Sequence, residues 1–567
     1  MLRALDSSNP SEPMATPHRL LLLMVGPAGF AVMLAWGPLP QDDPAGYAIE
    51  NETVIDRCSR CHVVDDDGRM SRISYLRKTP EGWQTSVRRM VSLHGARLST
   101  EDAREIVRYL SNAQGLAPEE ALPGRFEAER RMIDYDYEGD SGVEYTCIQC
   151  HSMGRVITQR RTGEEWGLLL ATHRGLYPLV DAQAFRRGGP PPEDGDARHP
   201  MDVAIAHLSD VFPLETPEWS AWSATQRTPR LAGIWALSGY EIGKGPVYGT
   251  VTISVDDEDE AAFSTSASYI YAETGERVER SGEALVYTGY QWRGRTNAGT
   301  DTELREVMFV DRDQREMTGR WFSGAYDEMG PDVTLRRVGA DVVVTGIYPK
   351  AVERGTSVEV RVFGGGLTSA SASDLDFGPG ISVGSVDGPD GGALRVRLTI
   401  DADASVGARD LFAFGSIVEE AVIVHDGVDR IAVTPQTGMA RVGGVAFPKG
   451  YQTFEAIGYD DGADGEPGTE DDLELGRVDV SWRIEEYATV FGDDDIDFVG
   501  SMGQDGVFSP AIDGPNPNRS GNRNNLGDVW VIATHETESD GKLTARAHLI
   551  VTVPLYIRFE PWREVQR

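Results

Sequence analysis

Apolar and polar residues follow two different periods in the two parts of the chain. In the first third the period is helical: Ser99 and Asp102 form a capping-box pattern at the start of such a segment. The apolar residues behind them fall on one helix face, at Ala103, Ile106, Val107 and Leu110. Thr79 and Thr162 are expected as N-caps of two further helices, and residues 201–211 show a weaker helical pattern. This part is predicted to be mainly helical.

From about Trp235 onwards the period changes to two, which is typical of β-strands. Short strands are expected at residues 247–255, 268–272, 305–310 and 316–322. The Gly, Asp and Asn turns between them indicate a small barrel or sandwich. Two further alternating runs, at 358–362 and 394–400, repeat this period over about one immunoglobulin-like length. A third β unit is expected beyond them, with strands at 529–534 and 548–553.

The expected fold class is a multidomain α + β chain in which a mainly helical domain precedes three antiparallel β domains. The 567 residues leave room for about four domains. The expected boundaries are 1–44 for a leader, 45–225 for the helical domain, 226–339 for a barrel-like domain, 340–428 for an immunoglobulin-like domain and 429–567 for a C-terminal sandwich.

The N-terminus has the pattern of an export signal. A short positive region is followed by an apolar stretch from Leu20 to Trp36, which Gly26, Pro27 and Gly29 interrupt. Such a short and broken stretch spans a bilayer poorly, so cleavage is expected, and an uncleaved anchor is the alternative. The mature protein is therefore expected outside the cytoplasm, in the periplasm of a cell with two membranes.

The charge balance excludes one class of partner. The chain has 54 Lys and Arg against 90 Asp and Glu, which gives a net charge of -36. The resulting field repels nucleic acid and anionic lipid, so any partner that is steered by charge should be basic.

All four cysteines lie in two copies of the pattern Cys-x-x-Cys-His. The copies are Cys58, Cys61 and His62, and Cys147, Cys150 and His151. This pattern attaches haem c: both thiols bond to the vinyl groups, and the His ligates the iron. A zinc site, a redox disulfide or disulfides between the two pairs fit the spacing less well. Two haems c are expected, haem 1 within about 45–118 and haem 2 within about 119–225.

An internal repeat indicates the second ligand of each iron. Residues 77–83 align without gaps with residues 160–166, and seven residues past the Trp of each run stand Met90 and His173. Both residue types are common axial ligands. The expected ligand pairs are His62 with Met90 and His151 with His173.

The first haem has a competing ligand. His94 follows Met90 by four residues, so the two share a helix face, and a His/His site is the alternative there. Met70 is a reserve candidate. A Met ligand normally gives the iron a higher potential than a second His. Electrons are therefore expected to run from haem 2 to haem 1, with haem 2 nearer their source.

An acidic loop at residues 460–472 raises the question of calcium. Carboxylates on a Gly-rich turn suit calcium, but the EF-hand spacing does not fit this run. A solvated turn around Asp464 is the favoured interpretation, and Asp493, Asp494 and Asp495 are interpreted in the same way.

Several longer runs resemble a known family. They lie at residues 317–322, 464–472, 513–519 and 524–530. Together with both haem motifs they resemble the α (dihaem) subunit of quinohemoprotein amine dehydrogenase over nearly all of the mature chain. The resemblance implies a dihaem cytochrome c domain followed by three antiparallel β domains.

The same resemblance implies partners and a role. Members are αβγ heterotrimers, in which a small γ subunit carries cysteine tryptophylquinone and a β-propeller subunit helps to enclose it. The quinone oxidises primary amines to aldehyde and ammonia. The haems of the α subunit pass the electrons to an external copper protein or cytochrome c. No cysteine of this chain is left to build the quinone, and no catalytic residue is assigned to it.

Two other functions stay open. A dihaem cytochrome c peroxidase-like enzyme would need one iron with an open or labile sixth position. A stand-alone dihaem electron carrier would work without quinone-bearing partners.

Overall fold

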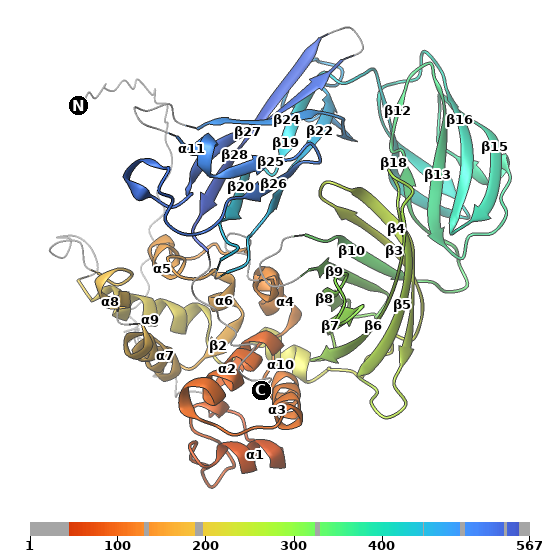
Figure 1. Ribbon diagram of the computed structural model, residues 1–567. Coiled ribbons are helices and arrows are strands. Elements are labelled where there is room, and N and C mark those ends of the chain that lie inside the picture. The colour runs from red at the N-terminus through yellow and green to blue at the C-terminus, as the bar shows by residue number, and fades with distance from the viewer. Residues whose placement is uncertain are drawn as a thin grey trace, which may run out of the picture. The chain divides into compact units, whose positions relative to one another are not determined.

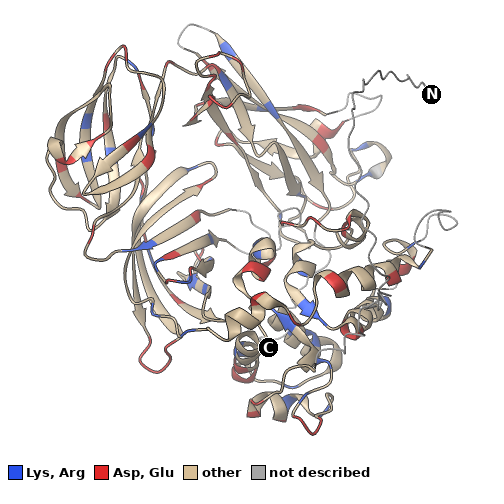
Figure 2. Cartoon of the chain, turned by 180° about the vertical axis from the view of Figure 1, so that it is seen from behind, with Lys and Arg blue, Asp and Glu red and all other residues tan. Residues whose placement is uncertain are grey.

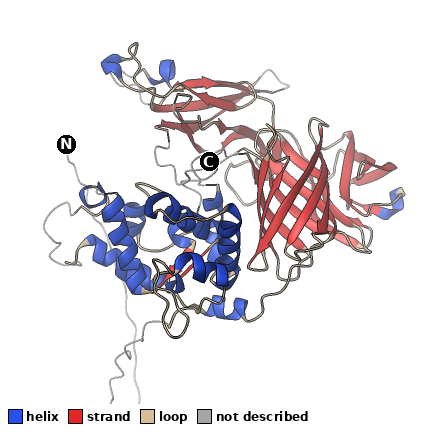
Figure 3. Cartoon of the chain, turned by 60° about the horizontal axis from the view of Figure 1, so that its bottom comes forward, coloured by secondary structure: helices blue, strands red, loops and turns tan. Residues whose placement is uncertain are grey.

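The structure is a computed structural model that describes residues 45–129, 135–177, 179–186, 197–323, 329–445, 447–487, 494–537 and 541–554. The expected leader, residues 1–44, lies outside them. Within the described ranges no helix is both long and apolar enough to cross a bilayer. Most of the helices precede the strands of the β domains and gather in one part of the molecule (Figure 3). The predicted fold class, a helical domain followed by antiparallel β domains, is confirmed.

The helical part runs to Ser223 (Figure 1). Its helices are α1 (Glu52–Cys58), α2 (Pro80–His94), α3 (Thr100–Ala113), α4 (Pro118–Ala121), α5 (Ser141–Cys147), α6 (Gly154–Ile157), α7 (Gly163–Leu176), α8 (Leu179–Ala182), α9 (Pro200–Val211) and α10 (Pro217–Ser223), with 3-10 turns η1 (Ile73–Tyr75) and η2 (Leu122–Ala128). The predicted N-caps are confirmed: the hydroxyls of Thr79 and Thr162 accept the N–H groups of Gly82 and Glu165. The capping box of Ser99 with Asp102 forms as predicted.

The two repeats meet in a short antiparallel sheet of β1 (Leu76–Lys78) and β2 (Gln159–Arg161). α2 follows β1 and α7 follows β2, so the two strand–helix units are related by a local two-fold pseudosymmetry. The indole N–H of Trp83 donates to the Gln114 carbonyl at 3.1 Å, and that of Trp166 donates to the Phe212 carbonyl at 3.1 Å. The sequence repeat is therefore also a repeat of packing.

Eight antiparallel strands form a closed barrel in the order β10-β3-β4-β5-β6-β7-β8-β9. They are β3 (Gly233–Glu241), β4 (Gly245–Val255), β5 (Ala262–Tyr271), β6 (Arg277–Tyr287), β7 (Gln291–Thr296), β8 (Leu304–Val310), β9 (Glu316–Phe322) and β10 (Asp332–Arg337). Trp235, Trp292 and Trp321 are buried in its core. β5 begins earlier than the predicted strand 268–272, because the small polar residues Ser264, Thr265 and Ser266 carry no clear apolar alternation.

Barrel and helical part are joined by buried polar contacts. Arg293 on β7 donates to the Glu81 carboxylate at the start of α2, with Nε–Oε1 at 2.6 Å. The Tyr290 hydroxyl donates to the Leu116 carbonyl at 3.0 Å. Arg320 on β9 forms an ion pair with Glu129 at 3.0 Å, and both side chains are almost fully buried. These contacts fix the barrel against the start of α2 and the segments after α3.

The next strands form two four-stranded sheets, β11-β13-β16-β15 and β12-β18-β17-β14. They are β11 (Val343–Tyr348), β12 (Ala351–Glu353), β13 (Ser357–Gly365), β14 (Leu375–Asp376), β15 (Ile381–Asp390), β16 (Ala393–Ile400), β17 (Gly407–Ala413) and β18 (Ser416–His425), with η3 (Ala372–Asp374). The alternating residues Val360, Val362 and Val396 are fully buried in one apolar core.

The last strands form three small sheets, β19-β22-β23, β20-β28-β27-β24 and β21-β26-β25. They are β19 (Arg430–Thr434), β20 (Thr437–Arg441), β21 (Gln452–Thr453), β22 (Glu455–Asp460), β23 (Leu473–Arg477), β24 (Ser481–Glu486), β25 (Gly500–Met502), β26 (Val507–Pro510), β27 (Gly527–Glu536) and β28 (Lys542–Thr552), with α11 (Asp495–Phe498) and η4 (Ser520–Asn522). Asp and Glu residues are spread over the helical and β parts alike (Figure 2).

The acidic loop between β22 and β23 uses its carboxylates within the protein. Arg430 forms ion pairs with Asp461 and Asp472. The Asp471 carboxylate accepts the Ala463 N–H at 2.7 Å, and the Asp464 carboxylate accepts the Glu466 N–H at 2.8 Å. In the ranges that the structure describes, no group of three or more His, Cys, Asp or Glu side chains could hold a metal ion. These contacts therefore give no support for a calcium site in this loop.

Candidate haem-binding sites

The rings of His151 and His173, which come from different elements, lie close together and line one cavity. His151 follows α5 and His173 lies on α7, and their ring centroids are 6.5 Å apart. Two imidazoles that bind one metal ion from opposite sides, each through a nitrogen ~2 Å from the metal, have ring centres about 6–7 Å apart. The observed separation therefore has room for one metal ion between the rings.

The hydrogen bonds of the predicted His ligands fix which ring nitrogen is available. Nδ1 lies 2.8 Å from the Ser71 carbonyl in His62, 2.9 Å from the Ser152 carbonyl in His151 and 2.9 Å from the Leu169 carbonyl in His173. Because a carbonyl oxygen only accepts, Nδ1 must be the donor in each ring. Nε2 then carries the free lone pair that a metal ligand needs.

Both imidazoles of the second site are neutral at pH 7. Burial, with a smaller contribution from Arg155, lowers the pKa of His151 to about 4. Burial also lowers the pKa of His173. A neutral imidazole is the form that coordinates a metal.

Both rings of the second site line a cavity of about 580 Å³. This volume lies in the range of about 300–1,000 Å³ that is typical of cofactor pockets. Cys147 and Cys150 line the cavity and are free thiols. The apolar lining includes Val156, Leu169, Leu170, Val180, Phe185 and Leu208. Paired thiols, neighbouring imidazoles and apolar lining residues fit a flat, apolar macrocycle with a central iron.

The residues of the first predicted site are more exposed. Cys58 ends α1, Cys61 is exposed, and both are free thiols. On α2, Met90 is half-buried whereas His94 is exposed. Met70 is fully buried in an apolar cluster with Val54, Trp83 and Leu110. Pairing of His62 with Met90 stays a prediction, and the partial burial of Met90 favours it over His94, since an axial ligand lies against the macrocycle.

Comparison with known protein families decides which family these sites belong to. The haem-binding model of the quinohemoprotein amine dehydrogenase α subunit matches residues 48–199. The models of domains II, III and IV of the same subunit match residues 228–338, 341–426 and 431–562. The chain belongs to this family.

The other comparisons add little to this family assignment. No curated protein matches the chain. A redesigned β-barrel and a de novo fluorescence-activating β-barrel are similar over 19% of this chain and 92% and 93% of theirs, at 12% and 16% identity and TM-scores of 0.16. A mixed-linkage glucan utilization protein of Bacteroides ovatus is similar over 57% of this chain and 64% of its own, at 12% identity and a TM-score of 0.19. The family match carries the assignment.

Sequence reasoning missed one feature of the haem-binding domain. The second cavity is lined not only by α7 but also by residues of the first repeat, on β1 and α2. Lys78 and Arg89 come from that repeat, and Arg155 and Arg161 come from the second. The basic residues at equivalent positions of the repeat, Lys78 and Arg161, were a signal that could have revealed this wall.

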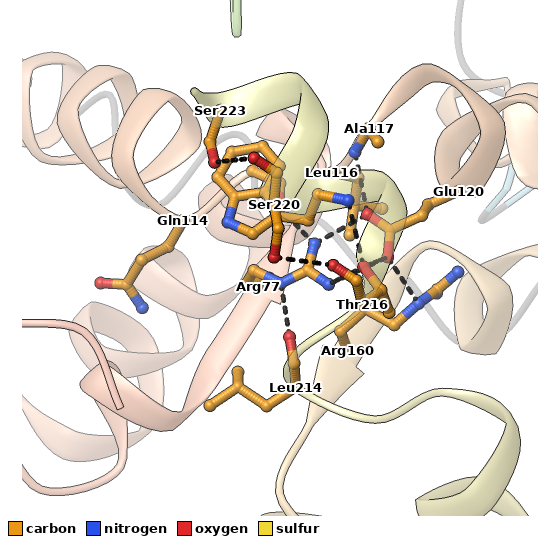
Figure 4. Close-up of polar contacts among 12 residues, drawn as sticks. Arg77, Gln114, Leu116, Ala117, Glu120, Arg160, Leu214, Thr216, Ser220 and Ser223 are labelled. Carbon is orange, nitrogen blue, oxygen red and sulfur yellow. Dashed lines mark hydrogen bonds and ion pairs between the residues drawn. The ribbon is translucent and has the colours of Figure 1, made fainter. Parts of the chain in front are cut away.

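A buried polar network surrounds Arg77 in the haem-binding domain (Figure 4). Its guanidinium donates to the carbonyls of Leu214 at 2.7 Å and Gly115 at 3.1 Å, and to the Thr216 hydroxyl at 3.0 Å. One side chain thereby ties β1 to the segment after α3 and to the start of α10. This network fixes the β1–β2 pair against these two segments.

Proposed function

We propose that this chain is the electron-transferring dihaem subunit of a periplasmic quinohemoprotein amine dehydrogenase. It accepts electrons from a cysteine tryptophylquinone in a small partner subunit, after that cofactor has deaminated a primary amine to aldehyde and ammonia. It delivers them to an external copper protein or cytochrome c. The observation that carries the proposal is the pair of neighbouring imidazoles, His151 and His173, in a cavity that apolar side chains and two free thiols also line.

The residues of this chain hold and tune the cofactor. Bound at these sites, haem c supplies an iron that gains and loses one electron. Thioether bonds would anchor it at Cys58 and Cys61 in the first site and at Cys147 and Cys150 in the second. The carbonyls that accept Nδ1–H orient His62 and His151, so that Nε2 is directed away from the backbone. Met90 and His173 would supply the second ligand of the iron in the first and second site.

The side chains that would hold each iron determine what the sites can do. If both side chains of each pair held the iron, no position would be left for peroxide or another substrate, which supports electron transfer over peroxidase chemistry. A Met ligand in the first site would raise its potential above that of the second. Electrons would then pass from the second site to the first, and the second site would lie nearer the quinone-bearing subunit.

The chain needs partners for the complete reaction. All its cysteines lie in the two haem motifs, so none remains to form a quinone cross-link. The quinone is therefore proposed in a small γ subunit, enclosed by a β-propeller subunit as third member of a heterotrimer. The net charge of -36 favours a basic external acceptor.

The test is amine-dependent reduction of the haems in the complex as isolated. The pyridine haemochrome assay is expected to give two haems per chain, and adding a primary amine should turn their spectrum from ferric to ferrous. The variant with Cys147→Ser and Cys150→Ser should retain one haem. A colourless protein would refute the proposal. Peroxide turnover with a high-spin ferric haem would identify a peroxidase instead, and purification without partners would identify a stand-alone carrier.

A further inference from the structure

The second cavity has a buried cation without a carboxylate of its own. Lys78 on β1 lines this cavity and is only 6% exposed. Its Nζ donates to the Ser86 hydroxyl at 2.7 Å and lies 5.5 Å from the centre of the Trp83 ring. Among the described residues its two other N–H groups meet no acceptor. A buried ammonium group with only a neutral partner is unfavourable unless an anion joins it.

The surroundings of Lys78 add positive charge. Arg161, which is 3% exposed, lies on β2 and stacks on Trp166 as Lys78 does on Trp83. The Glu165 carboxylate forms ion pairs with two cations: Arg161 Nη1 lies 3.7 Å from its Oε2, and Arg72 Nε lies 2.8 Å from its Oε1. One carboxylate therefore serves several cations.

Four other charged groups line the cavity. Arg89 on α2 lines the same cavity and forms no ion pair within the described ranges. The nearby Glu81 carboxylate is held by Arg293. Arg155 and Glu127 line the cavity as well and contribute one charge of each sign. Burial, with Arg161 and Arg89 as further causes, lowers the pKa of Lys78 well below its usual range, which an anion in the cavity would reverse.

We infer that Lys78, Arg89 and Arg161 bind the two propionate carboxylates of the haem in the second site. The inference rests on the proposed function, because it needs a haem in this cavity. In a porphyrin the vinyl groups that bond to cysteine and the two propionates lie at opposite edges. Cys147 and Cys150 come from α5 and the turn after it, whereas the cations come from β1, β2 and α2. Arginine and lysine side chains bind carboxylates through short, charge-assisted hydrogen bonds.

This binding links the two halves of the haem-binding domain. Lys78 and Arg89 belong to the first repeat but would neutralise charge on the haem of the second. A nearby cation stabilises the reduced iron, which carries one positive charge less than the oxidised iron. Lys78 and Arg89 are thus positioning residues that raise the potential of the second haem.

The experiment is a redox titration of the intact complex carrying Lys78→Met or Arg89→Gln. Each variant should keep two haems per chain and show a lower midpoint potential for the second haem alone. The second haem is identified as the one whose ferric electron paramagnetic resonance signal changes in His173→Met. Lys78→Arg should restore the potential. Lys350→Met is the matched control, because it removes the same charge at an exposed site on a β domain.

Unchanged potentials in both Lys78→Met and Arg89→Gln, with both haems present, would overturn the inference. So would an equal shift in Lys350→Met. If a variant does not fold, infrared redox-difference spectra of the unmodified complex, with haem labelled with ¹³C at the propionate carboxyls, give the answer. Label bands shifted from those of free carboxylates would support the inference, and solvated-type bands for all propionates would contradict it. Absence of covalent haem would refute the proposed function itself.

Discussion

Arg77 and Arg160, which hold the same position in the two repeats, form ion pairs with one carboxylate, that of Glu120. The two arginines lie opposite each other in the β1–β2 pair. Arg77 donates to both Glu120 oxygens, at 2.7 and 2.9 Å, and Arg160 Nε lies 3.1 Å from Oε1. Burial acts to raise the pKa of Glu120, but the hydrogen bonds and charges of Arg77 and Arg160 outweigh it and leave that pKa below its usual value. The local pseudosymmetry axis therefore passes close to a single shared anion.

The first prediction concerns this anion. Glu120→Gln should lower the free energy of unfolding by about 3–5 kcal/mol, because two buried guanidinium groups lose their counter-charge. Denaturant unfolding followed by circular dichroism measures the change. Glu536→Gln breaks an exposed pair with Lys542 and should cost no more than about 1 kcal/mol. Equal effects of the two substitutions would contradict the argument.

A second prediction concerns pH and the barrel. Glu306 on β8 is 4% exposed and accepts the Trp292 indole N–H at 2.8 Å. Burial raises its pKa from 4.5 to about 7, against the smaller opposing effects of Trp292 and Arg280. The folded state thus binds this proton more tightly than the unfolded state. The contribution of this carboxyl group to stability is therefore greatest below pH 4.5 and is lost as the pH rises through 7.

Glu306→Gln should remove this dependence. The variant should match the wild type near pH 4.5 and exceed it at pH 8, by up to about 3 kcal/mol. Thermal unfolding of both proteins across this pH range measures the gap. A gap that does not change with pH would show that the Glu306 carboxyl does not titrate as described.

A third prediction separates the two candidate ligands of the first haem. Met90→Leu should lower the potential of that haem and abolish the charge-transfer band of ferric iron bound to a Met sulfur. His94→Leu, one helical turn further on and exposed, should leave both unchanged. If His94→Leu alone alters the spectrum, the first site is a His/His site.

A fourth prediction concerns the helix that carries His173. Thr162→Ala removes the hydroxyl that accepts the Glu165 N–H at 3.2 Å and should destabilise the protein by about 1 kcal/mol. Thr162→Ser keeps the hydroxyl and should retain most of the stability. Denaturant midpoints of the three proteins provide the comparison, and a Ser variant as unstable as the Ala variant would argue against the cap.

The features predicted well from sequence are those that local chemistry determines. Thr79, Thr162 and Ser99 cap helices because a hydroxyl beside free N–H groups needs no distant partner. Strand β9 was predicted at residues 316–322, where apolar alternation is clear. By contrast, the positive wall at Lys78 and Arg161 arises only when β1 pairs with β2, and closure of the barrel depends on β3 pairing with β10. Neither pairing can be predicted from a short stretch of sequence.

The contacts between the barrel and α2 determine how far the chain can be shortened. Glu81 lies at the first turn of α2, lines the second cavity and is held by Arg293 of the barrel. A fragment that stopped after α10 would lack Arg293 and Arg320. These are the barrel cations that form ion pairs with Glu81 and Glu129. The helical part and its barrel are therefore expected to fold as one unit, and truncation upstream of Arg337 should prevent the haem-binding domain from assembling intact redox sites.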